Sequence, residues 1–234
     1  MHRVVNDPST DPATVLGTLL RERRSTRAFL PEQVPDETIA AVLADAQETP
    51  SNCNTQPWDV HVVSGATRQR LSDALHKANG AGELSLDFTF DASLFEGRLG
   101  ERRREQGAAY HDALGVSRDD WEARRKASAD NLSFFGAPHV VLLFMPLIGD
   151  GVRVASDVGM YAQTLLLAMA ARGICAVPQT SLAFHAESTR RVLGLANDRK
   201  LLFGISFGFP DPDSPAIQYK IGRDAINNNV TFHS

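Results

Sequence analysis

The sequence predicts a domain of mixed secondary structure in which helices alternate with about four buried strands. Apolar residues recur at helical spacing in several segments, and the longest of these, residues 152–172, is apolar on nearly every face. Short uninterrupted apolar runs at 138–145 and 200–209 are typical of strands that are covered on both faces. This pattern alone does not decide between a doubly wound sheet and a mostly antiparallel one. No G-x-G-x-x-G or Walker sequence follows a strand, which argues against a dinucleotide or NTP fingerprint.

Capping residues and turn formers set the limits of the expected elements. Asp11 is placed to cap the first helix with Pro12 in its first turn, and Pro35 opens the second helix in the same manner. Gly173 stands where glycine commonly ends a helix. We expect helices at 11–24, from 35 onward, and at 68–79, 94–114, 118–134, 152–172 and 186–195, and strands at 60–63, 138–145, 200–209 and within 174–181, where a strand runs into a turn.

Composition indicates an ordinary globular protein. Of 234 residues, 43% are hydrophobic and 22% charged, and the net charge of -4 gives no overall attraction to nucleic acid or to an anionic membrane. The two cysteines, Cys53 and Cys175, argue for a reducing compartment, and no cysteine–histidine spacing suggests a metal site. Because residues 1–7 lack the apolar run of a signal peptide, we expect a cytoplasmic protein.

We interpret residues 1–234 as a single domain with two irregular parts. Residues 80–90 are glycine-rich, and the charged helices after them make 80–135 a helical excursion. Residues 210–234 are rich in Pro, Asp and Asn and are expected to form an extended C-terminal arm. The run Glu101-Arg102-Arg103-Arg104-Glu105 has the charge of a nucleic-acid patch, but its arginines alternate with acids along a helix, which favours a solvated or interfacial face.

The long apolar segment at 152–172 is expected to be a core helix and not a membrane span. Its uninterrupted apolar part falls short of the roughly 20 residues that a span requires. It is interrupted by Ser156, Asp157, Gln163 and Thr164. We therefore expect no contact with a membrane, and we expect this helix to contribute to a dimer interface.

A cluster of basic residues lies at the end of the first helix, whose apolar face is formed by Val15, Leu16, Leu19 and Leu20. A planar guanidinium can hold a phosphate through two parallel charge-assisted bonds, and the hydroxyls of Ser25 and Thr26 add further donors. The cluster therefore suits a phosphate monoester. On these residues alone, a solvated basic helix end that offsets the helix dipole is the more ordinary interpretation. The arginines are Arg21, Arg23, Arg24 and Arg27.

A second segment, residues 50–58, changes that interpretation. It reads Pro-Ser-Asn-Cys-Asn-Thr-Gln-Pro-Trp, and its short amide and hydroxyl side chains can hydrogen-bond a flat ring and a polyol without adding charge. The two segments together resemble the signatures of the bacterial nitroreductase family of flavin enzymes, which read R-R-S-x-R after the first helix and P-S-x-x-N-x-Q-P-W after the second. Within that family the chain looks most like the nitrobenzoate-reductase branch.

The resemblance implies an α+β fold with a central, mostly antiparallel sheet surrounded by helices. It also implies an intertwined homodimer with FMN bound at the interface, NADPH or NADH as electron donor, and an arm that extends along the partner. Residues 80–135 correspond to the variable insertion that shapes the substrate pocket in the family. Carried over residue by residue, the cofactor-binding set is Arg23, Arg24, Ser25, Arg27, Asn131, Pro178, Gln179, Thr180 and Arg223, with Pro50, Ser51, Asn52 and Asn54 contributed by the other chain.

Three roles within this set are more specific. The Pro178-Gln179 turn would lie against the flavin ring, and a backbone amide near Thr180 would donate to flavin N5. Arg223 would complete the phosphate site; the family often has a basic residue two positions earlier, where this chain has Ile221, and Lys220 is adjacent. No catalytic side chain is expected, because the flavin carries the chemistry.

The resemblance implies two-electron, ping-pong transfer from NAD(P)H to nitroaromatic or quinone-like acceptors. Three alternatives stay open at this point. The first is an enzyme of the same fold that fragments flavin or removes halogen from a phenol. The second is a module that binds FMN without turnover. The third, from the arginines alone, is a nucleic-acid binder.

Overall fold

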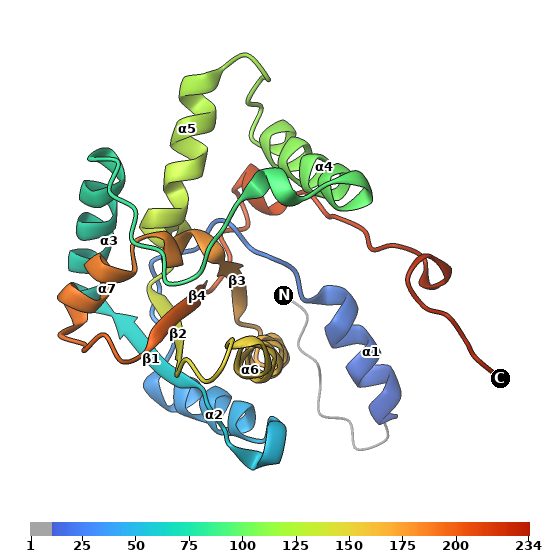
Figure 1. The fold of residues 1–234 in the computed structure, drawn as a ribbon. Coiled ribbons are helices and arrows are strands. Elements are labelled where there is room, and N and C mark those ends of the chain that lie inside the picture. The colour runs from blue at the N-terminus through green and yellow to red at the C-terminus, as the bar shows by residue number, and fades with distance from the viewer. Residues whose placement is uncertain (1–10) are drawn as a thin grey trace.

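The computed structural model describes residues 11–234, and a four-stranded antiparallel sheet forms its centre (Figure 1). The lateral order of the strands is β1-β2-β4-β3, and each neighbouring pair is antiparallel. The prediction of a mostly antiparallel sheet is confirmed, and the doubly wound alternative is excluded. The prediction that residues 1–7 do not form a signal peptide concerns residues that the structure does not describe. The strands are β1 (Asp59–Ser64), β2 (His139–Met145), β3 (Cys175–Gln179) and β4 (Lys200–Gly208).

Helices cover both faces of the sheet, which explains the uninterrupted apolar run of its central strand. All seven residues of β2 are buried. Alternate side chains of β2 enter different cores, because successive residues of a strand point to opposite faces: Leu142 belongs to one apolar cluster and Leu143 to the other. The first cluster includes residues of α3 (Gly65–Gly80) and α7 (Ala186–Leu193), and the second includes residues of α2 (Asp36–Gln47) and α6 (Val152–Ala171).

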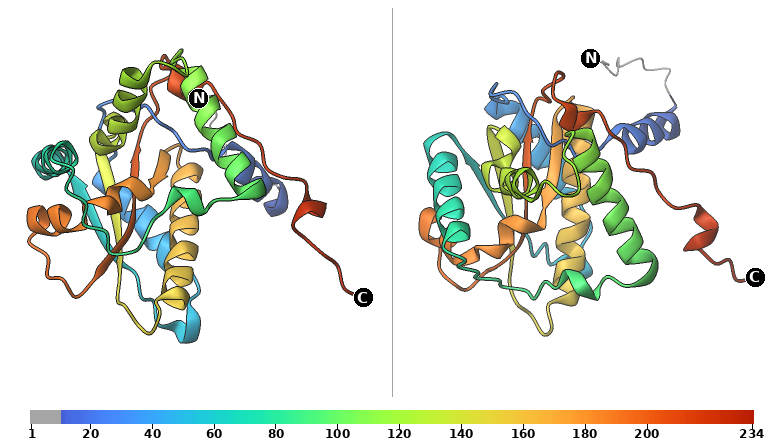
Figure 2. Two further views of the ribbon diagram at one scale, coloured as in Figure 1. Left: turned by 45° about the horizontal axis from the view of Figure 1, so that its top comes forward. Right: turned by 90° about the horizontal axis from the view of Figure 1, so that it is seen from above.

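Three further helices lie around this centre. Helices α4 (Gly97–Ala113) and α5 (Trp121–Ala129) form the excursion between β1 and β2, and Figures 1 and 2 show them standing over the end of the sheet. Helix α1 (Pro12–Glu22) lies beside α6. Its start agrees with the prediction, since the Asp11 carboxylate accepts a hydrogen bond of 3.0 Å from the Thr14 amide.

Four predicted helix boundaries differ from the structure by three residues or more. Helix α4 begins at Gly97 and not at residue 94, and helix α5 begins at Trp121 and not at residue 118. The other two boundaries differ for clear local reasons. Helix α3 begins at Gly65, directly after β1, and not at residue 68, because Gly65 adopts a φ of +55° and turns the chain without a loop. Helix α5 ends at Ala129 and not at residue 134. The chain after it is the short 3-10 segment Asp130–Gly136, in which Phe134 and Phe135 have φ of 59° and 53° and so cannot continue an α-helix.

Helix α6 is the one helix among the described residues that is long and apolar enough, by length and composition, to cross a membrane. Half of that stretch is buried within the protein, and the helix packs against the sheet and against α2, as expected for a core helix. The expectation that it is apolar on nearly every face is only partly right. Its uncovered side carries the small or polar residues Ser156, Gly159 and Gln163 together with Met160.

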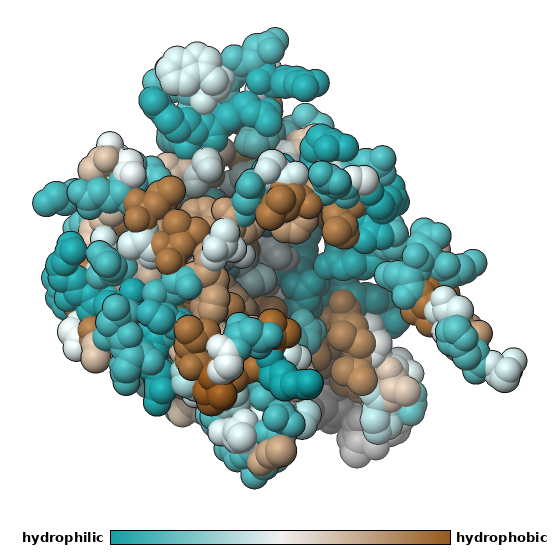
Figure 3. Space-filling model, viewed as in Figure 1, coloured by the Kyte–Doolittle hydropathy of each residue, from teal (hydrophilic) through white to brown (hydrophobic). Residues whose placement is uncertain are grey.

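Apolar surface is exposed elsewhere. No residue of α1 is buried, and Leu16 and Leu20 are each 50% exposed, so the apolar face predicted for this helix has no complete cover within one chain. Leu84 and Leu94 in the segment before α4 and Leu99 in its first turn are also exposed. Figure 3 shows apolar side chains gathered around a hollow on one face of the molecule. Apolar patches of this kind mark surfaces that other molecules cover.

The C-terminal arm (residues 210–234) contains no helix or strand other than two 3-10 turns, Pro215–Ile217 and Ile226–Asn228. Its end projects away from the rest of the chain in every view (Figures 1 and 2), and Phe232 is 86% exposed. The division of residues 1–234 into one domain with an excursion and an arm remains a prediction.

His139 makes the stability of this fold sensitive to mild acid. The side chain is buried in β2, stacks on Phe207, and its Nε2 accepts a hydrogen bond of 3.0 Å from the Val34 amide, which requires the neutral ring. Burial, opposed by Asp36 and aided by Arg68, lowers the pKa of His139 from 6.5. Below about pH 6.5 the unfolded chain therefore binds a proton that the folded chain does not, and the free energy of unfolding should fall as the pH is lowered through that value.

Urea denaturation between pH 8 and pH 5 measures this dependence. His139→Gln is the control, since its amide can still accept from Val34 but does not titrate. We expect a shallower loss of stability in this variant than in the unaltered protein. Identical slopes would show that His139 is not responsible.

Candidate functional site

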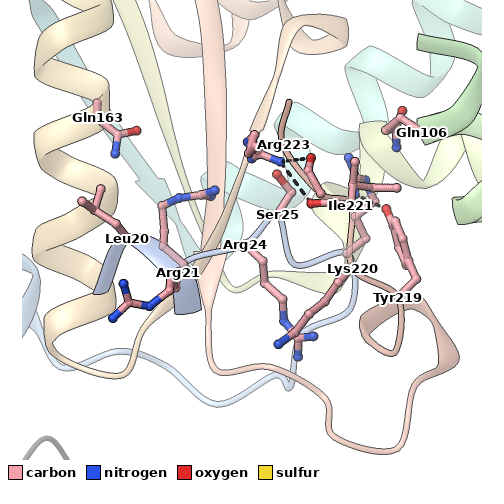
Figure 4. Close-up of a pocket in the computed structure, with 13 residues that line it drawn as sticks. Leu20, Arg21, Arg24, Ser25, Gln106, Gln163, Tyr219, Lys220, Ile221 and Arg223 are labelled. Atoms are coloured by element: carbon pink, nitrogen blue, oxygen red, sulfur yellow. Dashed lines mark hydrogen bonds between the residues drawn. The ribbon is translucent and has the colours of Figure 1, made fainter. Parts of the chain in front are cut away.

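The arginine cluster opens onto a cavity of about 580 Å³ between α1, α6 and the C-terminal arm. Figure 4 shows the side chains around it: Leu20 and Arg21 come from the end of α1, Gln106 from α4, Gln163 from α6, and Lys220 to Arg223 from the arm. The chain therefore brings together two segments that are about two hundred residues apart in the sequence. The full lining is Leu20, Arg21, Arg23, Arg24, Ser25, Arg27, Gln106, Gln163, Tyr219, Lys220, Ile221, Gly222 and Arg223.

The electrostatics of this cavity favour an anion. Six lining side chains are cationic and none is a carboxylate. Within residues 11–234, none of the six lies within ion-pair distance of an acidic side chain. Burial and then repulsion from Arg223 lower the pKa of Arg23, which shows that the positive charges are close enough to oppose one another. An anionic ligand would relieve this repulsion.

Aromatic side chains hold Arg27 without neutralising it. Its guanidinium donates to the Tyr219 hydroxyl and lies 5.3 Å from the centre of the Tyr110 ring. Burial, aided by Asp130 and opposed by Arg27, raises the pKa of Tyr110 to about 12, so the phenol stays protonated at neutral pH. Neither tyrosine was singled out as a site residue from the sequence, where Tyr110 could equally be a packing residue.

Arg223 is placed by the arm and by α4. Its guanidinium donates to the backbone carbonyls of Ile221 and Gly222 at 3.1 and 3.0 Å (Figure 4). The next residue, Asp224, pairs with Arg98 and Arg102 of α4, with a distance of 3.0 Å to Arg98. This contact fixes the arm at the point where Arg223 faces the cavity.

The second signature forms a strained loop that is attached to α6. Cys53, Asn54 and Gln56 have φ of 51°, 56° and 45°, a region that residues other than glycine seldom adopt. The loop is held by the buried carboxylate of Asp157, which accepts from the Asn52 amide at 3.2 Å with each oxygen, and by Ser51 Oγ, which accepts from the Gln56 amide at 2.9 Å. Sequence reasoning missed Asp157, although an acid inside an apolar helix was the signal for it.

A hydrogen-bonded network links Asn131 to the turn after β3. Gln179 Nε2 donates to the Asn131 carbonyl at 3.0 Å, and Ser181 Oγ donates to Asn131 Oδ1 at 3.1 Å. Gln179 Oε1 accepts in turn from Ser206 of β4. Asn131 also lines a second cavity, of about 800 Å³, between α4 and α5. The two cavities share Arg27 and Gln106 in their walls.

The predicted set thus falls into three groups within one chain. Arg23, Arg24, Ser25, Arg27 and Arg223 line the first cavity, while Asn131 and Gln179 are joined by the network, with Pro178 and Thr180 exposed beside Gln179. The signature-loop residues do not line either cavity. Their assignment to the cofactor site of a second chain stays a prediction. They are Pro50, Ser51, Asn52 and Asn54.

Comparison with known proteins gives one consistent result. The nitroreductase family model matches residues 20–209. The nitroreductase NfnB of Mycolicibacterium smegmatis is 44% identical over 96% of this chain and 95% of its own, and a 4-nitrobenzoate reductase of Nocardioides is 31% identical over 92% of this chain and 88% of its own. The crystal structure of the FMN-dependent nitroreductase NfnB from Mycobacterium smegmatis in complex with NADPH covers 96% of this chain and 100% of that chain, with a TM-score of 0.92 and 43% identity. The chain described here belongs to the nitroreductase family.

Proposed function

We propose that this protein is an FMN-dependent oxidoreductase that uses NAD(P)H to reduce nitroaromatic or quinone-like compounds. The observation that carries the proposal is the cavity beside α1, lined by six cationic side chains and no carboxylate. None of the six is fully buried, but like charges gathered in one concave surface repel one another and attract a counter-ion. The phosphate of FMN supplies an anion of this kind.

The residues present fit FMN. Arg23, Arg27 and Arg223 offer guanidinium groups for a terminal phosphate, and Ser25 adds a hydroxyl. Thr26, next to them, has a buried hydroxyl without a hydrogen-bond partner among the described residues. The Asn131–Gln179 network holds the turn after β3 in place, and the exposed residues Pro178 and Thr180 on either side of Gln179 offer a fixed surface for the ring end of the cofactor.

Bound FMN supplies two-electron chemistry: NADPH, a proton and a nitro compound give NADP+, water and a nitroso compound, and a second round gives the hydroxylamine. The chain contributes binding and orientation. Arg27, held by two tyrosines, and Arg223, held by the arm, fix the phosphate end of the cofactor, and the turn from Pro178 to Thr180 fixes the ring end. No nucleophilic side chain is required for this reaction.

The relatives support the same activity. NfnB carries the name nitroreductase, other relatives of about 30% identity are named 4-nitrobenzoate reductases, and the structure of NfnB contains NADPH. The alternative is a module that stores FMN without turnover. Such a module would use the cavity beside α1 but would not need a second cavity. The Asn131 cavity, which adjoins the first through Arg27 and Gln106, provides room for a second molecule and favours the enzyme.

A spectrum of the purified protein before and after anaerobic NADPH tests the function. We expect flavin absorption that bleaches on NADPH and returns on addition of nitrobenzene. Flavin released by heat should run with FMN and not with FAD, because the arginine cluster ends the site at a monoester. A protein without bound flavin contradicts the cofactor, and flavin that does not bleach with either NADPH or NADH contradicts the enzyme.

We also propose that the protein is a homodimer and that the signature loop of each chain completes the cofactor site of the other. The exposed apolar residues of α1, such as Leu16 and Leu20, and the projecting arm supply a surface for a second chain. A ligand that binds only the assembled form stabilises it. Two free cysteines, Cys53 and Cys175, support a cytoplasmic location.

Sedimentation of dilute protein with and without FMN measures this linkage. The apo-protein is expected to dissociate at higher concentration and to unfold at lower temperature than the holo-protein. The difference should grow with the concentration of free FMN. A monomer that carries one FMN for each chain would contradict the composite site.

A further inference from the structure

The arginine run of α4 has two separate environments. Arg102, together with Arg98, pairs with Asp224 and so holds the C-terminal arm. Arg103 and Arg104 instead line the cavity between α4 and α5. The two halves of the run therefore have different surroundings and require separate explanations.

Four arginines face this second cavity from two helices and the turn between them. Arg103 and Arg104 come from α4, Arg118 from the connection, and Arg124 from α5. Together they are called the cleft arginines below. The acidic side chain in the lining is Asp112, and none of the cleft arginines forms an ion pair with a carboxylate anywhere in residues 11–234.

The cleft arginines lack ion pairs although acidic residues lie close to them in the sequence. Glu101 and Glu105 flank the run on α4, and Asp119, Asp120 and Glu122 flank Arg118 and Arg124. Of these, Glu101 and Glu105 pair with Arg98, away from the cavity, and the Asp120 carboxylate caps α5 by accepting from the Ala123 amide at 2.9 Å. The cleft arginines thus leave a concave surface of about 800 Å³ with an excess of positive charge.

This surface is continuous with the proposed cofactor site. Arg27 and Gln106 line both cavities, and Asn131, which is joined to the turn at Gln179, lines the second. A molecule whose reactive end reaches the flavin from this side would therefore extend its other end towards the cleft arginines. This inference rests on the proposed function, in which the molecules that reach the flavin are the electron donor and the electron acceptor. The molecule bound here is therefore a donor or an acceptor that carries an anionic group far from its reacting atom.

We propose that the cleft arginines bind the 2′-phosphate of NADPH and make the enzyme prefer NADPH to NADH. A phosphate monoester carries a charge of about −1.5 to −2 at neutral pH and three acceptor oxygens, which several guanidiniums can share. NADH has a neutral hydroxyl at that position, so it gains nothing from the unpaired arginines. The difference between the two nucleotides is the group that this charge pattern recognises.

The test measures KM for NADPH and for NADH in the FMN-loaded enzyme with nitrobenzene as acceptor. In the double variant R103Q/R104Q and in R124Q, KM for NADPH should rise roughly tenfold to a hundredfold, as expected for the loss of charge-assisted hydrogen bonds. KM for NADH should change less than twofold. The matched control is R125Q on α5, because Arg125 lies over the Trp121 ring, 5.1 Å from its centre, and lines neither cavity.

A binding measurement separates this inference from the activity. Adenosine 2′,5′-bisphosphate should compete with NADPH in the unaltered enzyme, weakly in the two cleft variants, and less well as salt is raised. Equal loss for NADH and NADPH would overturn the assignment. A selective loss for 4-nitrobenzoate over nitrobenzene would also overturn it, since the cleft would then hold the carboxylate of the acceptor. If neither nucleotide bleaches the flavin in the unaltered protein, the proposed function has failed and not this inference alone.

Discussion

FMN binding should weaken sharply when Arg27 and Arg223 are replaced by alanine. Both guanidiniums line the cavity beside α1, and each variant removes a charge-assisted contact worth about 1.5–3 kcal/mol per hydrogen bond. That range corresponds to a dissociation constant roughly tenfold to a hundredfold higher for each substitution. The double variant should lose more than either single variant, and titration of the apo-protein with FMN measures the three constants.

The control is R70A, which removes an exposed arginine of α3 that donates to Thr67 and lines neither cavity. Its affinity for FMN should be unchanged. If both Arg27→Ala and Arg223→Ala also bound FMN with unchanged affinity, the phosphate would lie elsewhere. The thermal unfolding of apo-Arg223→Ala should be similar to that of the unaltered apo-protein, because this exposed side chain bonds only to neighbouring carbonyls of the arm. Arg27→Ala also loses the contacts with Tyr219 and Tyr110, so its apo-form should unfold at a somewhat lower temperature.

The largest expected loss of stability follows from replacing Asp87 by alanine. Its carboxylate is buried and accepts from Arg190 at 2.6 and 3.1 Å and from the Leu201 amide at 2.8 Å. One side chain thereby ties the segment before α4 to α7 and to the start of β4. Removing one partner of a buried ion pair leaves the other charge without compensation, which costs about 3–5 kcal/mol.

The exposed pair between Arg172 and Asp45, with a distance of 2.7 Å, is the matched control. Asp45→Ala should cost less than about 1 kcal/mol, because solvent screens the interaction. Burial tends to raise the pKa of Asp87, but the hydrogen bonds and charges of Arg190, Leu201 and Lys200 outweigh it, and the pKa lies below 3.8. The ionised Asp87 carboxylate therefore contributes fully to the free energy of unfolding above about pH 4, and this contribution is lost as the pH falls through its lowered pKa. Equal costs for the two variants in urea denaturation would contradict this account.

Much of the fold followed from the sequence because the relevant signals are local. The cap at Asp11, the left-handed Gly173 and the apolar runs of β2 and β4 placed most elements within a few residues. The sheet topology did not follow from periodicity, since a strand covered on both faces reads alike in parallel and antiparallel sheets. The family signatures supplied that information, and the strand pairing agrees with it.

The site followed from the sequence only in part. The arginines and Arg223 could be placed together through the family pattern, and they line one cavity, while Asn131 and Gln179 are hydrogen-bonded to each other. That all of them belong to one cofactor site stays a prediction. The side chains that hold them could not be found, because Tyr219, Tyr110 and Asp157 act through contacts between segments far apart in the chain. The different surroundings of Arg102 and of Arg103 and Arg104 could not be predicted either, because they depend on where the arm and α5 lie in space.

The attachment of the C-terminal arm bears on how long a cofactor molecule stays bound. Arg223 belongs to a segment without helix or strand, and the neighbouring Asp224 holds that segment to α4 through two arginines. One wall of the cavity can therefore open by local detachment of the arm while the sheet stays intact. With FMN in the proposed cavity, its residence time should depend on how often Asp224 separates from Arg98 and Arg102. Salt should shorten it, although the rest of the cavity is unchanged.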